Sequence, residues 1–446
     1  MPLEMFMFAT TRMALLIGGS IGGATFPLFA QETTKNDTVI VTSPVQSGAT
    51  KLATPDIETP QSVSIITRQQ FEEQGATSVR QAVSYTPGVY SNQIGASNRF
   101  DYIVLRGFSD GSLDNVYLDG LKMMGDTNSH SSLVVDPWFL EDIEVVRGPA
   151  SVLYSREKHK LRQTGYYLQD QMSWDRWRFT LGGRYDRVSV SNIDKLHDSR
   201  SDLDKNNVST RAALLYLFDN GVAPYLSYST AFTPTSFADE NGNVLEPMKG
   251  KQWEAGVKYE PLGGNSQFSA AVYRINQTNI ATKEEPTDPY RSIGEIESKG
   301  VELEAISHLS DNVRLQAAYT YTDIRYKKSS PQEQGKRAVY APRNQASAWL
   351  SYDVKSGLLE GLTLGSGIRY VNGVTSDRLN THTLPSYTLV DMVVGYDLSS
   401  IGLNGLSAQL NVNNLTDKRY VAACNSLSYC YFGAERSIVG SVSWAF

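Results

Sequence analysis

The sequence is poor in the residues that build metal and redox sites. Of its 446 residues, only two are cysteines and five are histidines. The histidines are scattered, and none has a second ligand at the spacing of a zinc or haem site. We therefore expect no metal site and no protein-bound cofactor.

Positive charge and long apolar runs are also scarce. The 41 Lys and Arg residues are outnumbered by 47 Asp and Glu residues, which gives a net charge of −6 and argues against nucleic acid as a partner. The mean hydropathy of −0.31 excludes a protein with many membrane-spanning helices, because each such helix needs about 20 mostly apolar residues. It does not exclude a membrane β-barrel, whose strands alternate apolar and polar residues.

An arrangement of nucleophile and base is missing as well. The stretch 18–22 matches the G-x-S-x-G pattern of hydrolases, but it lies inside an apolar N-terminal run with no strand before it. We therefore expect that the protein is not an enzyme.

The N-terminus has the pattern of a secretory signal peptide over residues 1–30. Arg12 precedes the apolar run 13–17, and Ala30 offers a cleavage point. A single membrane anchor is the alternative, but the apolar run is too short to span a bilayer. Residues 31–54 are mostly polar and are expected to form a flexible periplasmic arm.

Residues 55–155 are predicted to form a small α+β domain. The stretch 62–67 alternates like a strand, and 68–74 and 78–85 are predicted as short helices, the second capped by Thr77. Short β segments separated by Gly and Asp turns follow.

From residue 162 to 446 the sequence changes to long segments with a period of two. Trp253 and Ala255, for example, flank the polar Glu254. About thirteen such segments are present, each about ten residues long or longer, which is the length of a tilted transmembrane strand. The last one ends on Trp444 and Phe446. We therefore predict an all-β membrane barrel, although an odd strand count is unusual for bacterial barrels.

Several motifs resemble those of TonB-dependent siderophore receptors. They are TPQSVSIIT (59–67), LRGF (105–108), YLDG (117–120), EVVRGPASVLY (144–154), QTGYYLQDQ (163–171), LGGRYD (181–186) and NNLTDKRY (413–420). The ending, with its two cysteines and GAER at 433–436, is especially similar to ferrichrome and ferrioxamine receptors. The resemblance implies a plug domain over 55–155 inside a barrel in the bacterial outer membrane.

The resemblance also implies a partner for the N-terminal arm. One segment looks like a TonB box, the stretch that the TonB energy-coupling protein grips: Asp37, Thr38, Val39, Ile40, Val41 and Thr42. Its β-prone residues in a polar context suit binding by strand addition.

One departure from the family is large. Where the family has the end of the plug and the first barrel strands, this sequence runs from Tyr154 through 155–160 directly into a mid-barrel strand. Thirteen strands of a 22-stranded type of barrel leave roughly nine missing, or on the order of 200 residues. We interpret this as an internal deletion near residues 154–160.

The family holds plug arginines against barrel glutamates, and four residues match this pattern: Arg106, Arg147, Glu254 and Glu302. The two-residue period independently places both glutamates on the lumen side, because Trp253 and Val301 beside them face lipid. Buried carboxylates need partners, and arginine offers a bidentate one. A solvated lumen charge without a specific partner is the alternative.

Cys424 and Cys430 lie close together in an exported chain, so an oxidising periplasm favours a disulfide between them; two free thiols are the alternative. The resemblance places ligand contacts near Gly111 and Ser112 and around Met123 and Met124. Tyr431 and Phe432, beside the cysteines, are further candidates.

The resemblance implies TonB-energised uptake of iron(III)–siderophore complexes, of the hydroxamate type, across the outer-membrane lipid. The iron would arrive already chelated, so no cofactor is expected. Two alternatives stay open. In the first, the chain is a remnant of such a receptor that cannot transport, because open sheet edges are unstable in lipid. In the second, it is a smaller passive pore.

Overall fold

The structure is a computed structural model. It describes residues 45–46, 48–49, 53–97, 102–108, 116–119, 121–122, 125–126, 131–132, 135–148, 161–194, 199–235, 237–262, 265–282, 289–427 and 429–444.

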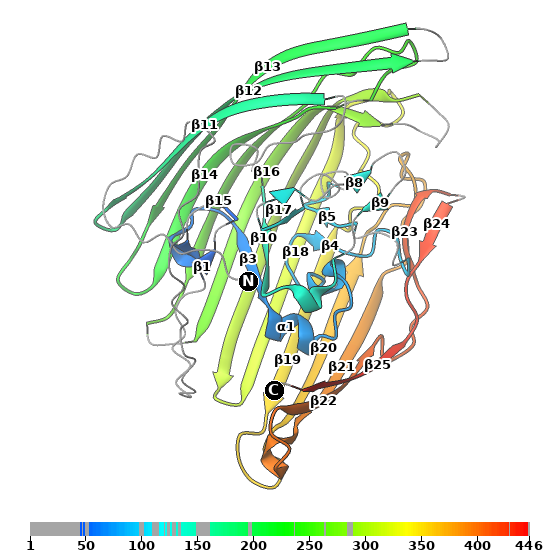
Figure 1. The fold of residues 1–446 in the computed structure, drawn as a ribbon. Helices are drawn as coiled ribbons and strands as arrows, with labels where there is room; N and C mark the ends of the chain where they lie inside the picture. Colours follow the sequence, from blue (N-terminus) through cyan, green and yellow to red (C-terminus); the bar gives the residue numbers. More distant parts are fainter. Residues whose placement is uncertain are drawn as a thin grey trace, which may run out of the picture.

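The dominant element in the described part of the chain is one thirteen-stranded sheet (Figure 1). Its strands follow the order of the sequence, and every neighbouring pair is antiparallel. They are β11 (Leu161–Trp174), β12 (Trp177–Asp194), β13 (Ser199–Tyr216), β14 (Val222–Thr233), β15 (Met248–Tyr259), β16 (Ser266–Thr282), β17 (Arg291–Ser310), β18 (Val313–Lys328), β19 (Asn344–Asp353), β20 (Leu362–Asn372), β21 (Tyr387–Asp397), β22 (Leu406–Asn413) and β25 (Ser437–Trp444).

Alternating side chains explain why these segments form strands with two different faces. In β15, Trp253 is 55% exposed on the outer face, while the next residue, Glu254, is 1% exposed on the inner face. In β16, Val272 is exposed between the buried Ala271 and Tyr273. Apolar residues therefore face outward along the sheet, as a lipid environment requires.

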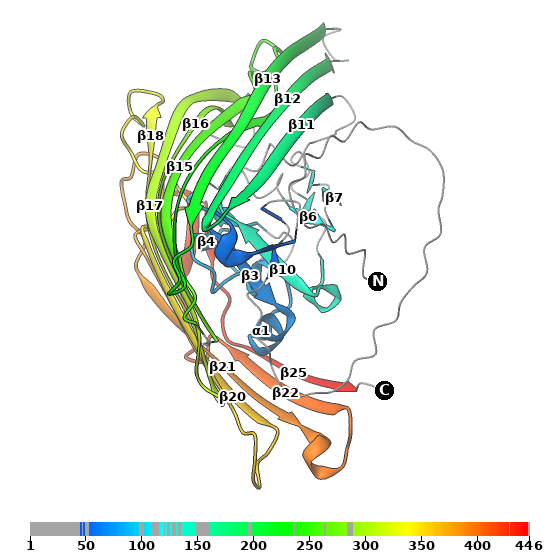
Figure 2. The ribbon, with the colours of Figure 1, turned by 90° about the vertical axis from the view of Figure 1, so that its left-hand side faces the viewer.

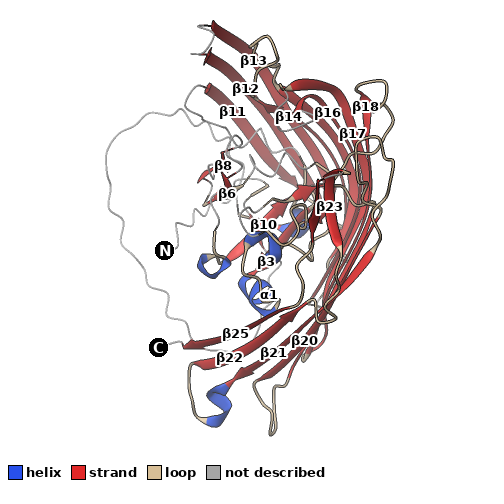
Figure 3. Cartoon of the chain, turned by 90° about the vertical axis from the view of Figure 1, so that its right-hand side faces the viewer, coloured by secondary structure: helices blue, strands red, loops and turns tan. Residues whose placement is uncertain are grey.

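The sheet curves around the N-terminal part of the chain without closing (Figures 2 and 3). β11 and β25 are its two rims, and among the described strands each pairs with one neighbour, β12 and β22 respectively. The predicted membrane sheet of about thirteen antiparallel strands is confirmed, and it is open.

The N-terminal part, described between residues 45 and 148, lies on the concave side of the sheet; we call it the N-terminal unit (Figure 2). Its centre is the antiparallel pair of β3 (Val63–Thr67) and β10 (Asp142–Val146), covered by α1 (Arg68–Glu73) and α2 (Val79–Ala82). A small apolar core joins them: Ile66, Phe71, Ala82, Val83 and Val89.

Short elements complete the N-terminal unit. They are β1 (Val45–Gln46), β2 (Thr54–Pro55), η1 (Asp56–Glu58), β4 (Val89–Tyr90), β5 (Val104–Leu105), β6 (Tyr117–Leu118), β7 (Leu121–Lys122), β8 (Gly125–Asp126), β9 (Ser131–Ser132) and η2 (Pro137–Phe139). The expected cap of α2 was wrong: Ser78, not Thr77, is the N-cap, and its side chain accepts a hydrogen bond from the Gln81 amide. Thr77 instead donates its hydroxyl to the Gln81 side chain.

A hairpin of β23 (Val421–Ser426) and β24 (Tyr429–Phe432) stands apart from the sheet, between β22 and β25 in the chain. A 3-10 turn, η3 (Leu398–Ile401), precedes β22. Within the described residues, no helix is long and apolar enough to cross a membrane.

Candidate functional site

The strands opposite the N-terminal unit carry acidic residues on their inner face. Glu254 lies in β15, and Glu302 and Glu304 lie in β17, with β16 between the two strands. Glu302 and Glu304 are two residues apart, so they point to the same side of the sheet. Two arginines of the N-terminal unit, Arg106 and Arg147, meet these carboxylates; we call the five residues the charge cluster.

Arg106 binds two of these carboxylates at once. Its Nε and Nη2 donate to Oε1 and Oε2 of Glu302 at 2.9 and 2.8 Å, and its Nη1 donates to Oε2 of Glu254 at 2.6 Å. Its guanidinium also lies 4.1 Å from the centre of the Tyr273 ring. The planar guanidinium suits this forked contact, which fixes orientation as well as charge.

Arg147 follows β10 directly and completes the cluster. Its Nη2 lies 3.3 Å from Oε2 of Glu304, and its Nε lies 3.4 Å from Oε2 of Glu302. Its Nη1 donates to the Pro87 carbonyl at 3.0 Å. Glu302 therefore faces both arginines.

The other oxygens of the carboxylates have neutral partners from both sides of the interface. Oε1 of Glu254 accepts hydrogen bonds from the Ser62 amide at 2.8 Å, the Ser62 hydroxyl at 2.9 Å and the Tyr225 hydroxyl at 2.8 Å. The Ser64 hydroxyl lies 2.8 and 2.7 Å from the two oxygens of Glu304. Such partners are what make a buried charge tolerable.

Electrostatics keeps both arginines charged. Burial lowers the pKa of Arg106, but the carboxylates of Glu302 and Glu254 outweigh burial and hold that pKa well above its ordinary value. Burial likewise opposes the charge of Arg147, and Glu304 and Glu302 raise its pKa overall. Two cations thus face three acidic side chains in a buried interface.

The structure brings together the four residues that the sequence analysis grouped: Arg106, Arg147, Glu254 and Glu302. Glu304 was missed, although its spacing from Glu302 places it on the same face. Ser62 and Tyr225 were also missed, because no local pattern shows which inner-face groups will touch the N-terminal unit.

A hydrogen bond to a charged carboxylate also joins the N-terminal unit to the sheet further along. The hydroxyl of Tyr85 donates to Oδ2 of Asp391 at 2.6 Å, and Arg369 donates to the same carboxylate at 2.8 and 3.0 Å. Burial raises the pKa of Tyr85 well above its ordinary value. The positive charge of Arg369 opposes this rise, and the negative charge of Asp391 adds to it. Tyr85 therefore stays a neutral donor.

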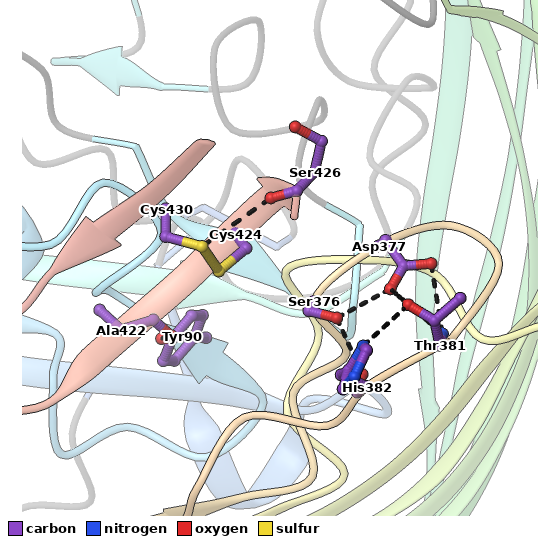
Figure 4. Close-up of a disulfide and its surroundings, with 9 residues drawn as sticks. All are labelled: Tyr90, Ser376, Asp377, Thr381, His382, Ala422, Cys424, Ser426 and Cys430. Atoms are coloured by element: carbon purple, nitrogen blue, oxygen red, sulfur yellow. Dashed lines mark hydrogen bonds between the residues drawn. A yellow bond between two sulfur atoms is a disulfide. The ribbon is translucent and has the colours of Figure 1, made fainter. Parts of the chain in front are cut away.

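The β23–β24 hairpin contacts the N-terminal unit from another side (Figure 4). Cys424 and Cys430 form a disulfide across it, with an S–S distance of 2.03 Å, so the predicted disulfide is confirmed. The Tyr90 hydroxyl donates to the Ala422 carbonyl at 2.5 Å, and the Ala96 amide donates to the Phe432 carbonyl at 2.9 Å. The hairpin is therefore pinned to the N-terminal unit at two points.

The candidate ligand residues are only partly described. Tyr431 is half-buried and its hydroxyl donates to that of Tyr429 at 3.3 Å, while Phe432 is exposed. Gly111, Ser112, Met123 and Met124 lie outside the described residues, as does the segment 37–42 with its expected TonB box. Among the described residues, no group of three His, Cys, Asp or Glu side chains is placed to hold a metal ion.

The antiparallel sheet has an apolar outer face and surrounds a small unit that buried ion pairs hold in place. This arrangement is that of an outer-membrane receptor. A family model described as "TonB dependent receptor-like, beta-barrel" matches residues 25–415. The chain belongs to the TonB-dependent receptor family, which consists of transport receptors rather than enzymes and resides in the bacterial outer membrane.

Named relatives agree with this assignment. The ferrioxamine B receptor of Salmonella typhimurium SL1344 is 63% identical over 702 residues, covering 100% of both chains. The ferrichrome outer membrane transporter/phage receptor of Escherichia coli K12 is 37% identical, covering 76% of this chain and 47% of that protein. The crystal structure of the ferric-catecholate import receptor Fiu from Escherichia coli K12 has a TM-score of 0.72 at 13% identity, covering 91% of this chain and 99% of that one, and shows the shared fold.

The alignment with the Salmonella receptor also measures what this chain lacks. An alignment of 702 positions that takes up all 446 residues leaves 256 positions with no residue of this chain opposite them. Identity at 63% of 702 positions corresponds to about 442 positions, almost the full length of this chain. The two sequences are thus nearly identical wherever both have residues.

Proposed function

We propose that this chain is a receptor for ferric hydroxamate siderophores of the ferrioxamine type, coupled to the TonB protein. The observation that carries this proposal is the relation to the Salmonella ferrioxamine B receptor, at 63% identity over 702 residues. The iron would be held by the siderophore, so the protein would need to recognise an organic shell and not a bare ion.

In this proposal residues 1–30 direct export, residues 31–54 form the periplasmic arm with a TonB box at 37–42, the unit over 55–155 acts as the plug, and 162–446 stand in the membrane. The charge cluster supports a plug role, because it holds the N-terminal unit to the sheet through buried ion pairs. A pull on the arm would have to work against these contacts.

The proposed ligand face lies on the side of the β23–β24 hairpin. Tyr431 and Phe432 would offer aromatic surface, with Gly111, Ser112, Met123 and Met124 contributing from the N-terminal unit. Support comes from the pinning of the hairpin to that unit through Ala96 and Phe432. A ligand that touched the hairpin would therefore press on the plug directly.

A second candidate function is that of a receptor that cannot transport on its own. The observation that favours it is the pair of open rims, β11 and β25. In a bilayer, unpaired backbone groups cost several kcal/mol each. A passive pore is the third possibility, and it would require the sheet to enclose a stable channel.

Growth and uptake separate these candidates. The chain would be expressed in a strain without hydroxamate receptors, with ferrioxamine B as the sole iron source, beside a matched Ile40→Pro variant in the proposed TonB box. Growth that is lost in the variant and in a strain without TonB supports coupled uptake. Binding of radiolabelled ferrioxamine B without growth supports the receptor that cannot transport, whereas stable conductance in planar bilayers supports the pore.

A further inference from the structure

The two rims of the sheet are membrane strands that, within the described part of the chain, pair with another strand along one edge only. β11 (Leu161–Trp174) has 14 residues and β25 (Ser437–Trp444) has 8, and each pairs with one described strand only. Lipid provides no hydrogen bonds for the other side of these strands, so a sheet in a bilayer must close or be paired.

Some inner residues of the rim strands are exposed, whereas those of the middle strands are covered. In the central strands the inner residues Gln252, Glu254 and Ser298 are buried against the N-terminal unit. In β25 the inner residues Ser437 and Ser441 are exposed, as is the inner residue Tyr167 of β11. The described part of the chain therefore leaves these three inner side chains open, although the inner residue Gln163 of β11 is buried.

Strand direction decides what can fill the opening. Because all thirteen strands alternate in direction, the first and the thirteenth, β11 and β25, run the same way. Closing the sheet on itself would give a parallel seam. A second copy inserted in the same orientation would give two parallel seams. Only a segment with an odd number of strands pairs antiparallel with both rims and makes the total even, as in bacterial barrels.

Length sets the size of that segment. The sheet spans 284 residues from Leu161 to Trp444, or about 22 residues for each of its thirteen strands. In the alignment with the Salmonella receptor, 256 positions have no residue of this chain. A segment of that length would supply at most about twelve strands of this size. Nine strands would bring the barrel to 22, the number in plugged outer-membrane transporters, and would leave about 60 positions for the end of the plug.

We propose that the rims β11 and β25 form a docking surface for a separate polypeptide with an odd number of transmembrane strands, nine in the fitting case. This chain then supplies the larger part of a two-chain barrel. The partner pairs with the whole length of both rims and covers the exposed inner residues beside them. The inference concerns assembly and does not depend on which siderophore is bound.

The test is complementation in the outer membrane with a defined partner. The partner is the part of the Salmonella receptor that aligns with no residue of this chain. It is expressed as a separate polypeptide with an added signal peptide and an affinity tag. A matched control lacks its final strand, so that it carries an even number. The readouts are co-purification with this chain, the shift in gel mobility between unheated and boiled samples, and hydrogen exchange of the β11 and β25 amides.

We expect the odd-stranded partner to co-purify, to give a heat-sensitive complex and to slow exchange at both rims at least tenfold. The even-stranded control should protect one rim at most. The proposal is overturned if the odd partner leaves exchange at both rims unchanged, or if this chain alone already protects them by pairing with itself or with a second copy. None of these readouts involves siderophore, so they separate this proposal from that of ligand uptake.

Discussion

The outer face of the sheet carries exposed apolar residues both in its middle and at its rims. The inner face differs, because its polar residues are buried in the middle and exposed at the β25 rim. In the middle, β15 and β17 present carboxylates that are buried and paired with Arg106 and Arg147. At the rim, β25 presents Ser437 and Ser441 to open space. The outer residues Trp253 in the middle and Val442 at the rim, by contrast, are both exposed to the surroundings.

This difference shows that alternation and burial are separate properties. The two-residue period requires only that one face of the strand meets lipid and the other meets water or polar protein groups. The rim strands meet the same condition, so the period continues in them. In β15 and β17 the N-terminal unit buries the inner face, whereas in β12 the inner residues Val188 and Val190 are buried against Phe232 and Val244. Polar residues facing the N-terminal unit are tied to specific partners, as Gln163 of the β11 rim is to Asp186, whereas Ser437 and Ser441 of the β25 rim are exposed.

The largest effect should come from removing a carboxylate of the charge cluster. Glu302→Gln takes the charge from a group that faces both Arg106 and Arg147, and breaking a buried ion pair costs about 3–5 kcal/mol. The N-terminal unit should then open from the sheet far more often, and hydrogen exchange of the β3 amides should measure this.

The matched control is Glu435→Gln, which removes the exposed partner of Arg419. It should cost less than about 1 kcal/mol, because solvent screens such pairs. If the two variants exchanged at equal rates, the cluster would not hold the N-terminal unit in place.

A charge on the outer face of the middle of the sheet should have the next largest effect. Val272→Lys places an ammonium on the lipid side of β16, which costs about 2–4 kcal/mol near the midplane. Ser441→Lys places the same group on the uncovered inner face of β25 and should cost almost nothing. Guanidinium unfolding in lipid vesicles, followed by tryptophan fluorescence, measures both; equal losses would mean that the faces are assigned wrongly.

Opening the disulfide should loosen one hairpin and leave the sheet intact. The double change of Cys424→Ala and Cys430→Ala releases a loop constraint worth about 2 kcal/mol in the chain-entropy account. Exchange of the Ala96 amide, which donates to Phe432, should quicken. Tyr90→Phe removes only the hydrogen bond to Ala422 and should give a smaller change of about 1 kcal/mol. Unchanged exchange in the double variant would show that the hairpin does not depend on its disulfide.

The smallest effect should come from an acidic residue outside the interface. Burial raises the pKa of Asp377, but hydrogen bonds from Thr381 and Ser376 outweigh burial and lower it overall. Since the folded pKa lies below the unfolded value of about 3.9, the carboxylate stabilises its turn above that pH. This stabilisation is lost as the pH falls through the folded pKa.

Asp377→Asn should therefore weaken the turn 374–384 by about 1 kcal/mol or less at pH 7 and make little difference at pH 2. Exchange of the Thr381 amide at the two pH values measures this. Asp219→Asn, in an exposed pair with Arg176, serves as the control. An equal effect at both pH values would contradict the role given to the carboxylate.

Sequence reasoning succeeded where a local pattern carried the information. The period of two gave the sheet and placed Glu254 and Glu302 on its inner face, because Trp253 and Val301 beside them are apolar. The number of strands followed from the same pattern.

It failed where partners are chosen by tertiary contacts. Nothing near Ser62 or Tyr225 in the sequence shows that both will bind Glu254. The cap of α2 fell on Ser78 because two adjacent residues could each serve as caps and backbone geometry chose between them. The inward contact of the β23–β24 hairpin likewise depends on the position of Tyr90 and Ala96, which are more than 300 residues away in the chain.

Hydrogen exchange of this chain in outer-membrane vesicles is the most direct test of the central claim. The account holds that the N-terminal unit seals the inner face of the open membrane sheet at β15 and β17, and that the rims β11 and β25 each pair with one described strand only. It predicts slow exchange in β15 and β17 and fast exchange in β11 and β25 when the chain is alone. Equal protection of all thirteen strands, or fast exchange in β15 and β17, would contradict it.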